Sequence, residues 1–221
     1  MNNQESCLDL SRRNRIGMLE AIWGENKTSK QISEILKTIH LSGDIALVTR
    51  VSQEKAIEVQ ELVQDIFYHP LARCITLGEA PCINTELEEI IILTGGTSDI
   101  SVAAEADISL RWHGIKTRII CDIGVAGLHR LLDNLDTIKK AKVIIACAGM
   151  EGALPTVLAG LVSQPVIGLP VSTGYGVGLE GKAALAGMLS SCSPGLVVVN
   201  IDNGYGAAMA ALRIIGLTKK N

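Results

Sequence analysis

The chain has 221 residues, enough for one large domain or for an ordinary domain joined to a small one. Hydrophobic residues make up 48% of it and aromatic residues only 3%, so its core must be aliphatic, which is typical of a parallel sheet buried on both faces. The formal charge of −3, with no block of Lys and Arg, argues against nucleic-acid binding, and we expect neither a signal peptide nor a transmembrane helix.

The cysteines are scattered along the chain. There are six, with no C-x-x-C pair and no nearby His at a metal-binding spacing. We therefore expect neither a disulfide framework nor a zinc cluster, and predict reduced thiols in the cytoplasm.

Residues 1–88 have alternating charge and predict a small N-terminal α+β domain. The apolar spacing predicts an amphipathic helix over Leu8–Glu20 and a turn over Trp23–Lys27. Further along we expect a helix capped by Thr28 or Ser29, a strand over Ile45–Thr49, and a helix from Ser52 to about Gln64.

Residues 89–221 repeat a strand, a Gly-rich turn and a helix five times, which predicts an α/β domain with a doubly wound parallel sheet in three layers. The expected strands are Ile90–Leu93, Arg118–Cys121, Val143–Cys147, Val166–Leu169 and Leu196–Asn200. Helices should begin near Ser98, Gly127, Gly152, Glu180 and Gly206. Ligands of such sheets bind at the carboxyl ends of the strands, so the loops there are the candidate sites.

The first loop contains Gly95, Gly96, Thr97, Ser98 and Asp99. Glycines allow close approach of the backbone, and a helix N-terminus favours an anion, so the loop suits a phosphate group. An alternative is that Ser98 or Asp99 only caps the helix. The pattern is neither the dinucleotide-binding nor the P-loop motif.

The second loop contains Asp122 at a strand end and His129 one turn into the next helix. Asp122 is a candidate to hold a ribose hydroxyl, a metal ion or a proton. A lone histidine on a helix is more often structural than catalytic, so both interpretations of His129 stay open.

The third loop contains Glu151 as its one charged residue, among small residues that follow a buried strand. A carboxyl group at the mouth of an apolar crevice suits general acid–base catalysis. The alternative is a solvent-facing carboxylate that only favours the helix N-terminus.

The fourth loop offers Ser172, Thr173 and Gly174 as candidate binding residues. The next helix leads to Cys192, which lies among small polar residues. A thiol in a polar, open setting can reach its thiolate form, although a loop residue without a role is the alternative.

Together these loops resemble the aminoimidazole ribonucleotide carboxylase/mutase family over residues 89–221. The segments that carry the resemblance are "TGGTSD", "GLHR", "ACAGMEGALPTVLAG" and "PVIGLPV". One departure is Ala153, which stands where that family has a His before Leu154-Pro155. The resemblance implies a flavodoxin-type carboxylase fold.

Nearly the whole chain is similar to the LarB family of nickel-pincer-cofactor biosynthesis enzymes, through "LDLSRRNRIG", "WGENKT", "DIGVAGLHRLL" and "VVNIDNGYGA" among other segments. That resemblance implies carboxylation of nicotinic acid adenine dinucleotide at the pyridinium C5, with CO2 or bicarbonate as co-substrate, and release of AMP. The alternative is a purine-pathway ribonucleotide carboxylase or mutase, and a nucleotide-binding regulatory module without enzymatic activity is a third possibility.

The LarB resemblance also implies roles for the loop residues. Cys192 would be the nucleophile, Glu151 the base, and His129 a second candidate for it. The loop around Ser98 would hold the phosphates, and Asp122 would carry Mg2+. The fold family further implies a homo-oligomer, an octamer whose neighbouring subunits complete the sites.

Overall fold

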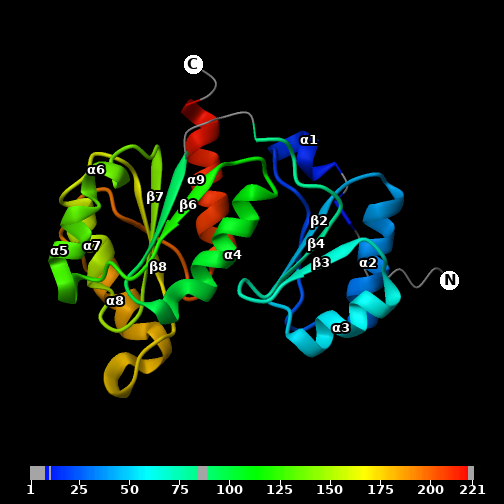
Figure 1. Cartoon of the computed structure of the whole chain (residues 1–221), viewed down its shortest axis with the longest axis horizontal. Helices are drawn as coiled ribbons and strands as arrows, with labels where there is room; N and C mark the ends of the chain where they lie inside the picture. Colours follow the sequence, from blue (N-terminus) through cyan, green and yellow to red (C-terminus); the bar gives the residue numbers. More distant parts are fainter. Residues whose placement is uncertain (1–7, 10, 84–88, 219–221) are drawn as a thin grey trace. The chain divides into compact units, whose positions relative to one another are not determined.

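A computed structural model describes residues 8–9, 11–83 and 89–218 of the chain (Figure 1). The contacts divide it into two compact units, Met1–Pro81 and Cys82–Asn221. The expected domain boundary after residue 88 borders the segment 84–88, which lies outside the described residues.

The N-terminal unit is a four-stranded mixed sheet with two helices packed on one face, as expected of a small α+β domain. The strand order is β1-β2-β4-β3, in which β1 and β2 are parallel and the other pairs antiparallel. The bounds are β1 Ala21–Trp23, α2 Ser29–Leu41, β2 Ala46–Thr49, α3 Gln53–Leu62, β3 Ile66–His69 and β4 Cys74–Leu77.

Side-chain caps fix where the two helices of this unit begin. Thr28 accepts a hydrogen bond from the Gln31 N–H at 3.2 Å, and the Gln31 side chain accepts one from the Thr28 N–H at 3.0 Å. Ser52 caps α3 in the same way through the Lys55 N–H at 3.3 Å. Each cap gives a hydrogen-bond acceptor to an N–H group that has no partner within the first helical turn. The prediction that these two helices begin at Thr28 and Ser52 is therefore confirmed.

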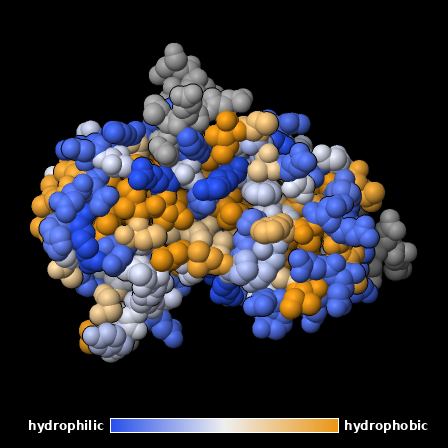
Figure 2. Space-filling model, viewed as in Figure 1, coloured by the Kyte–Doolittle hydropathy of each residue, from blue (hydrophilic) through white to orange (hydrophobic). Residues whose placement is uncertain are grey.

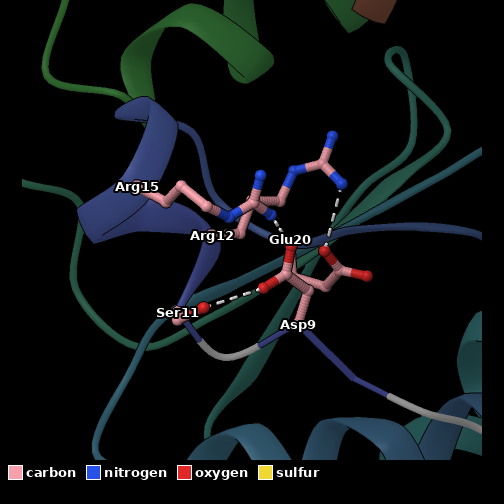
Figure 3. A network of polar contacts seen from close by, with 5 residues as sticks. All are labelled: Asp9, Ser11, Arg12, Arg15 and Glu20. Atoms are coloured by element: carbon pink, nitrogen blue, oxygen red, sulfur yellow. Dashed lines mark hydrogen bonds and ion pairs between the residues drawn. The ribbon is translucent and has the colours of Figure 1, made fainter.

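The expected helix over Leu8–Glu20 is wrong in its length. Among the described residues of this segment, only Arg12–Ile16 (α1) are helical, and Gly17 ends the helix by taking a left-handed conformation at φ +72°. Ion pairs fix the segment instead: Arg12 contacts Glu20 at 3.3 Å, and Arg15 pairs with Asp9 (Figure 3). The charges on this segment therefore pair across a bend rather than along one continuous helix.

The C-terminal unit is a five-stranded parallel sheet with helices on both faces. The strand order β6-β5-β7-β8-β9 is that of flavodoxin-like folds, so the predicted three-layer doubly wound architecture is confirmed. The strands are β5 Ile90–Thr94, β6 Thr117–Ile120, β7 Val143–Ala148, β8 Val166–Pro170 and β9 Val197–Val198.

Helices α4 (Ile100–Arg111) and α9 (Gly204–Thr218) pack against each other on one face of the sheet. The helices on the other face are α5 Leu128–Asp133, α6 Leu135–Ile138, α7 Ala153–Ala159 and α8 Lys182–Leu189 (Figure 1). Every residue of β5, β7 and β8 is buried, which explains the continuous aliphatic runs in the sequence. Within the described part of the chain, no helix combines the length and apolar character needed to cross a membrane.

Candidate active site

A pocket of about 220 Å³ lies at the carboxyl ends of the central strands of the C-terminal unit. Loops that follow β5, β6 and β7 form most of its wall, and Thr173, after β8, completes it. Six of the residues expected to act in the site line this pocket: Gly95, Gly96, Ser98, Asp99, Glu151 and Thr173. The sheet therefore gathers residues that are far apart in sequence, as a parallel sheet does at its carboxyl edge.

The N–H groups of the loop after β5 are partly used within the protein. Gly95 donates to the Cys147 carbonyl at 2.9 Å, and Gly96 donates to the Asp99 carboxylate at 2.9 Å. The hydroxyl-bearing residues Thr97 and Ser98 are exposed, and Ser98 lines the pocket. Hydrogen-bond donors for an anionic ligand would therefore come from Thr97 and Ser98, whereas Gly95 and Gly96 allow the neighbouring backbone segments to approach closely.

Asp99 is a buried carboxylate, 3% exposed, which lines the pocket and also caps the loop. Burial raises the pKa of Asp99, although hydrogen bonds from the backbone of Gly96, Gly95 and Gly149 oppose that shift. These bonds join the loop after β5 to the loop after β7. The Asp99 side chain thus closes the short turn Thr97–Asp99, whereas it makes no capping hydrogen bond to α4, the helix that the sequence left it open to cap.

Glu151 is exposed, lines the pocket and lies two residues before the start of α7. Its position is fixed by the backbone around it, since Met150 donates to the Thr173 carbonyl at 2.8 Å. A Cβ atom at position 149 would lie 2.3 Å from that carbonyl oxygen, and one at position 187 would lie 2.4 Å from the Glu151 carbonyl oxygen. Glycine at 149 and 187 therefore allows the contacts that place this carboxylate at the pocket wall.

Asp122 does not line the pocket, and its carboxylate accepts a hydrogen bond from Arg130 at 2.6 Å. Among the described residues, no group of three or more His, Cys, Asp or Glu side chains is placed to hold a metal ion. Because its expected ligand is engaged by a guanidinium group, the site does not fit a magnesium ion held by protein side chains alone.

Arg130 is the cation that sequence reasoning missed at this end of the sheet. It lies on α5 next to His129, and the "GLHR" segment directed attention to the histidine instead. A Cβ atom at position 127 would lie 2.7 Å from the Arg130 Nε atom, so Gly127 leaves room for the guanidinium group. His129 is exposed and does not line the pocket.

Cys192 lies in the segment between α8 and β9, exposed and outside the pocket lining. The neighbouring Ser193 hydroxyl donates to the Thr156 carbonyl on α7 at 2.8 Å, which fastens this segment beside the helix that follows Glu151. Ser172 and Gly174 flank the lining residue Thr173 without lining the pocket themselves. A single chain thus brings Glu151 and the Ser98 loop together, but not Cys192 or His129.

Comparisons with known proteins define the class of this fold and site. Residues 89–221 match the AIR carboxylase family, and residues 2–79 match the LarB/PurE-like N-terminal domain. The crystal structure of PurE from Treponema denticola superposes with a TM-score of 0.50 and 25% identity, over 58% of this chain and 80% of that one. The chain therefore belongs to the AIR carboxylase-like superfamily. Because the N-terminal unit is matched as well, it is a LarB-like member of that superfamily.

Two relatives from Methanocaldococcus jannaschii show the range of similarity. An uncharacterized protein is 39% identical over 212 residues, which is 92% of this chain and 81% of the relative. An N5-carboxyaminoimidazole ribonucleotide mutase is 37% identical over 139 residues, 60% of this chain and 82% of the relative. The first similarity extends over both units, whereas the second covers a length close to that of the C-terminal unit.

Proposed function

We propose that the protein carboxylates nicotinic acid adenine dinucleotide at C5 of the pyridinium ring and hydrolyses its phosphoanhydride bond. The products are pyridinium-3,5-biscarboxylic acid mononucleotide and AMP, and the pathway is nickel-pincer nucleotide biosynthesis. The observation that carries the proposal is the presence of a LarB/PurE-like N-terminal domain and an AIR carboxylase domain in one chain.

The ring chemistry needs a nucleophile because a pyridinium ring is too electron-poor to attack CO2. In the proposed mechanism the Cys192 thiolate adds to a ring carbon, and the resulting neutral enamine attacks CO2 from C5. A C–S bond and then a C–C bond form in these two steps. The Cys192 thiol is exposed, so a ligand can approach it, whereas Cys147 is buried and its burial raises the pKa of that thiol well above its usual range.

A base must next remove the proton from C5. We assign this step to Glu151, since a carboxylate at the pocket wall can reach a ring bound there. The C–H electron pair restores the aromatic ring, the C–S bond breaks and the thiolate leaves. The net change at the ring replaces a hydrogen by a carboxylate group without oxidation or reduction. His129 remains the second candidate for the base or for an electrostatic role.

The ligand's phosphates need positive charge and hydrogen-bond donors. Ser98 at the pocket and the exposed Thr97 supply hydroxyl groups, and Arg130 supplies a guanidinium group at the same end of the sheet. Water attacks the phosphoanhydride bond, and AMP is the leaving group. No step of the mechanism is routed through a metal ion. A dependence on Mg2+ carried by the phosphate oxygens stays a prediction, checked by comparing turnover with Mg2+ and with a chelator.

Within one chain Glu151 lines the pocket and Cys192 does not. We propose that a neighbouring copy supplies the missing group in a homo-oligomer, with an octamer as the expected size. Light scattering of the purified protein measures that size, and a monomer at working concentration would contradict the proposal.

Mass spectrometry tests the reaction directly. The protein is incubated with nicotinic acid adenine dinucleotide, 13C-bicarbonate and Mg2+. We expect AMP together with a mononucleotide that carries one labelled carboxyl group. Unlabelled bicarbonate gives the matched control for the mass shift, and unchanged dinucleotide would contradict the proposal.

The second candidate is a ribonucleotide carboxylase or mutase of purine synthesis. It is favoured by the 37% identity to an N5-carboxyaminoimidazole ribonucleotide mutase over 139 residues. The same assay with carboxyaminoimidazole ribonucleotides in place of the dinucleotide separates the two. Turnover of the ribonucleotide alone would support the mutase and leave Cys192 without a catalytic role.

A further inference from the structure

An exposed aromatic residue lies on a glycine-rich turn, two positions after Thr173, which lines the pocket. Tyr175 is 80% exposed, and its carbonyl accepts a hydrogen bond from the Gly178 N–H at 3.0 Å, which closes the turn. In Figure 1 the segment that leads from β8 to α8 projects away from the sheet. Figure 2 shows the projecting lobe largely in pale and orange colours, those of weakly polar and hydrophobic residues.

The turn is joined to the pocket wall through the backbone. Thr173 lines the pocket, and its carbonyl accepts a hydrogen bond from Met150, which is also a lining residue. A Cβ atom at position 174 would be 3.7 Å from the Gly178 Cα atom and 3.8 Å from the Met150 nitrogen. The turn therefore begins at the pocket and packs against its rim, with Tyr175 one residue beyond that contact.

The pocket is too small for a whole dinucleotide. Its volume of about 220 Å³ lies below the range of roughly 300–1,000 Å³ that encloses a drug-sized ligand. A dinucleotide that places its pyridinium ring beside Glu151 must therefore leave part of itself outside. The phosphates would follow the Ser98 loop, so the purine base is the portion left at the rim.

We propose that Tyr175 is a stacking platform for the purine base of a dinucleotide ligand at the rim of this pocket. The inference rests on the proposed function, which it extends by assigning the second half of the ligand. A tyrosine ring offers a flat apolar face at low cost in side-chain entropy, and every purine has a π-face to meet it. The phenol group is not needed for stacking, so phenylalanine should replace tyrosine.

Calorimetric titration in bicarbonate-free buffer tests the platform with two ligands, nicotinic acid adenine dinucleotide and nicotinic acid mononucleotide. Tyr175→Ala should weaken dinucleotide binding on the order of tenfold and leave mononucleotide binding within about twofold of wild type. Tyr175→Phe should bind both ligands as wild type does. Val177→Ser is the matched control, because Val177 is 88% exposed on the same segment and has no ring.

Each result has one meaning. If Tyr175→Ala binds the dinucleotide as tightly as wild type does, Tyr175 is not a stacking platform, and the proposed function is unaffected. If Tyr175→Ala weakens binding of both ligands equally, the stacking role of Tyr175 is also overturned. A smaller oligomer of this variant, measured by sedimentation, would assign Tyr175 to a contact with a second copy of the chain. A wild-type protein that binds neither ligand contradicts the proposed function, and the platform with it.

Discussion

At the scale of single residues, exposure divides the described cysteines into two groups. Cys74 and Cys147 are buried, whereas Cys82, Cys121 and Cys192 are exposed. We predict that Cys192→Ala abolishes ring carboxylation while the protein stays folded and binds the dinucleotide. Loss of an exposed loop side chain costs little stability, so the effect should be confined to the chemical step. Product formation by mass spectrometry and the melting temperature measure the two effects.

Cys121→Ala and Cys82→Ala are the matched controls, since both thiols are exposed and belong to the same unit as Cys192. Cys121 is the stricter control because it precedes Asp122 and follows β6 at the edge of the sheet that holds the pocket. Both variants should keep wild-type turnover. If Cys121→Ala were inactive and Cys192→Ala active, the nucleophile would be Cys121.

Glu151→Gln separates addition of the thiol from removal of the proton. The amide cannot accept the C5 proton, so we predict that the carboxylated ring stays attached to Cys192 and product release stops. Intact-protein mass spectrometry should detect a mass increase equal to the ligand plus CO2, which Cys192→Ala should not show. Normal product release by Glu151→Gln would show that another group is the base.

The raised pKa of Asp99 predicts a dependence of stability on pH. Burial raises this pKa above the ordinary aspartate value, so the folded protein binds the proton more tightly than the unfolded chain. The resulting stabilisation is complete below the ordinary aspartate pKa and is lost as the pH rises through the raised pKa of Asp99. Urea unfolding of wild type and Asp99→Asn across this interval should show wild type losing stability relative to the variant. A difference that stays constant with pH would contradict the prediction.

The candidate residues were predictable from their places after strands, but their hydrogen bonds were not. Sequence placed Ser98, Asp99 and Glu151 at one edge of a sheet, and the pocket brings these three together. It did not indicate that Asp99 would accept the Gly96 N–H or that Asp122 would pair with Arg130. Such bonds depend on backbone approach between loops far apart in the chain, for which the local pattern holds no information.

At the scale of elements, the loop after β7 depends on the absence of a side chain at Gly149. We predict that Gly149→Ala lowers the free energy of unfolding by about 1–3 kcal/mol and removes activity, because its Cβ would lie 2.3 Å from the Thr173 carbonyl oxygen. Gly160→Ala, at the other end of α7, meets only the Val157 carbonyl oxygen at 3.5 Å and should be tolerated. Chemical unfolding and turnover measurements on both variants check this prediction. If Gly149→Ala were as stable as Gly160→Ala, the close backbone contact at Gly149 would be refuted.

The elements of the C-terminal unit followed the sequence more closely than those of the N-terminal unit. Continuous aliphatic runs predicted β5, β7 and β8 to within one residue at each end, because full burial leaves a clear pattern. The expected strand Leu196–Asn200 is reduced to Val197–Val198 at the sheet edge, where only one neighbour supports it. In the N-terminal unit, the three-residue strand β1 and the turn at Gly17 are too short for periodicity to detect.

At the scale of the whole molecule, the absence of Cys192 from the pocket that Glu151 lines predicts complementation between inactive chains. If each site takes its base from one copy and its thiol from another, mixed oligomers of Cys192→Ala and Glu151→Gln contain some sites with both groups intact. We predict that co-expressing the two variants restores measurable carboxylation, although each alone is inactive. Each variant carries a different affinity tag, so purification on both tags in turn isolates the mixed oligomers. Oligomers that contain only one of the two variants are the controls. Mixed oligomers without activity would place both groups of a site in the same chain.

The frame of the pocket is made by the main chain. Gly95 bonds to Cys147, Met150 bonds to Thr173, and the backbone at Gly124 lies so close to Gly95 that a Cβ there would be 2.5 Å from the Gly95 carbonyl oxygen. The side chains that face the cavity take no part in these contacts, with the exception of Asp99. During evolution, the reactive side chains can therefore be substituted one at a time without loss of the fold that positions them. The same independence recommends Glu151, Ala153 and Ser98 as positions to randomise in directed evolution, with the glycines of the frame kept fixed.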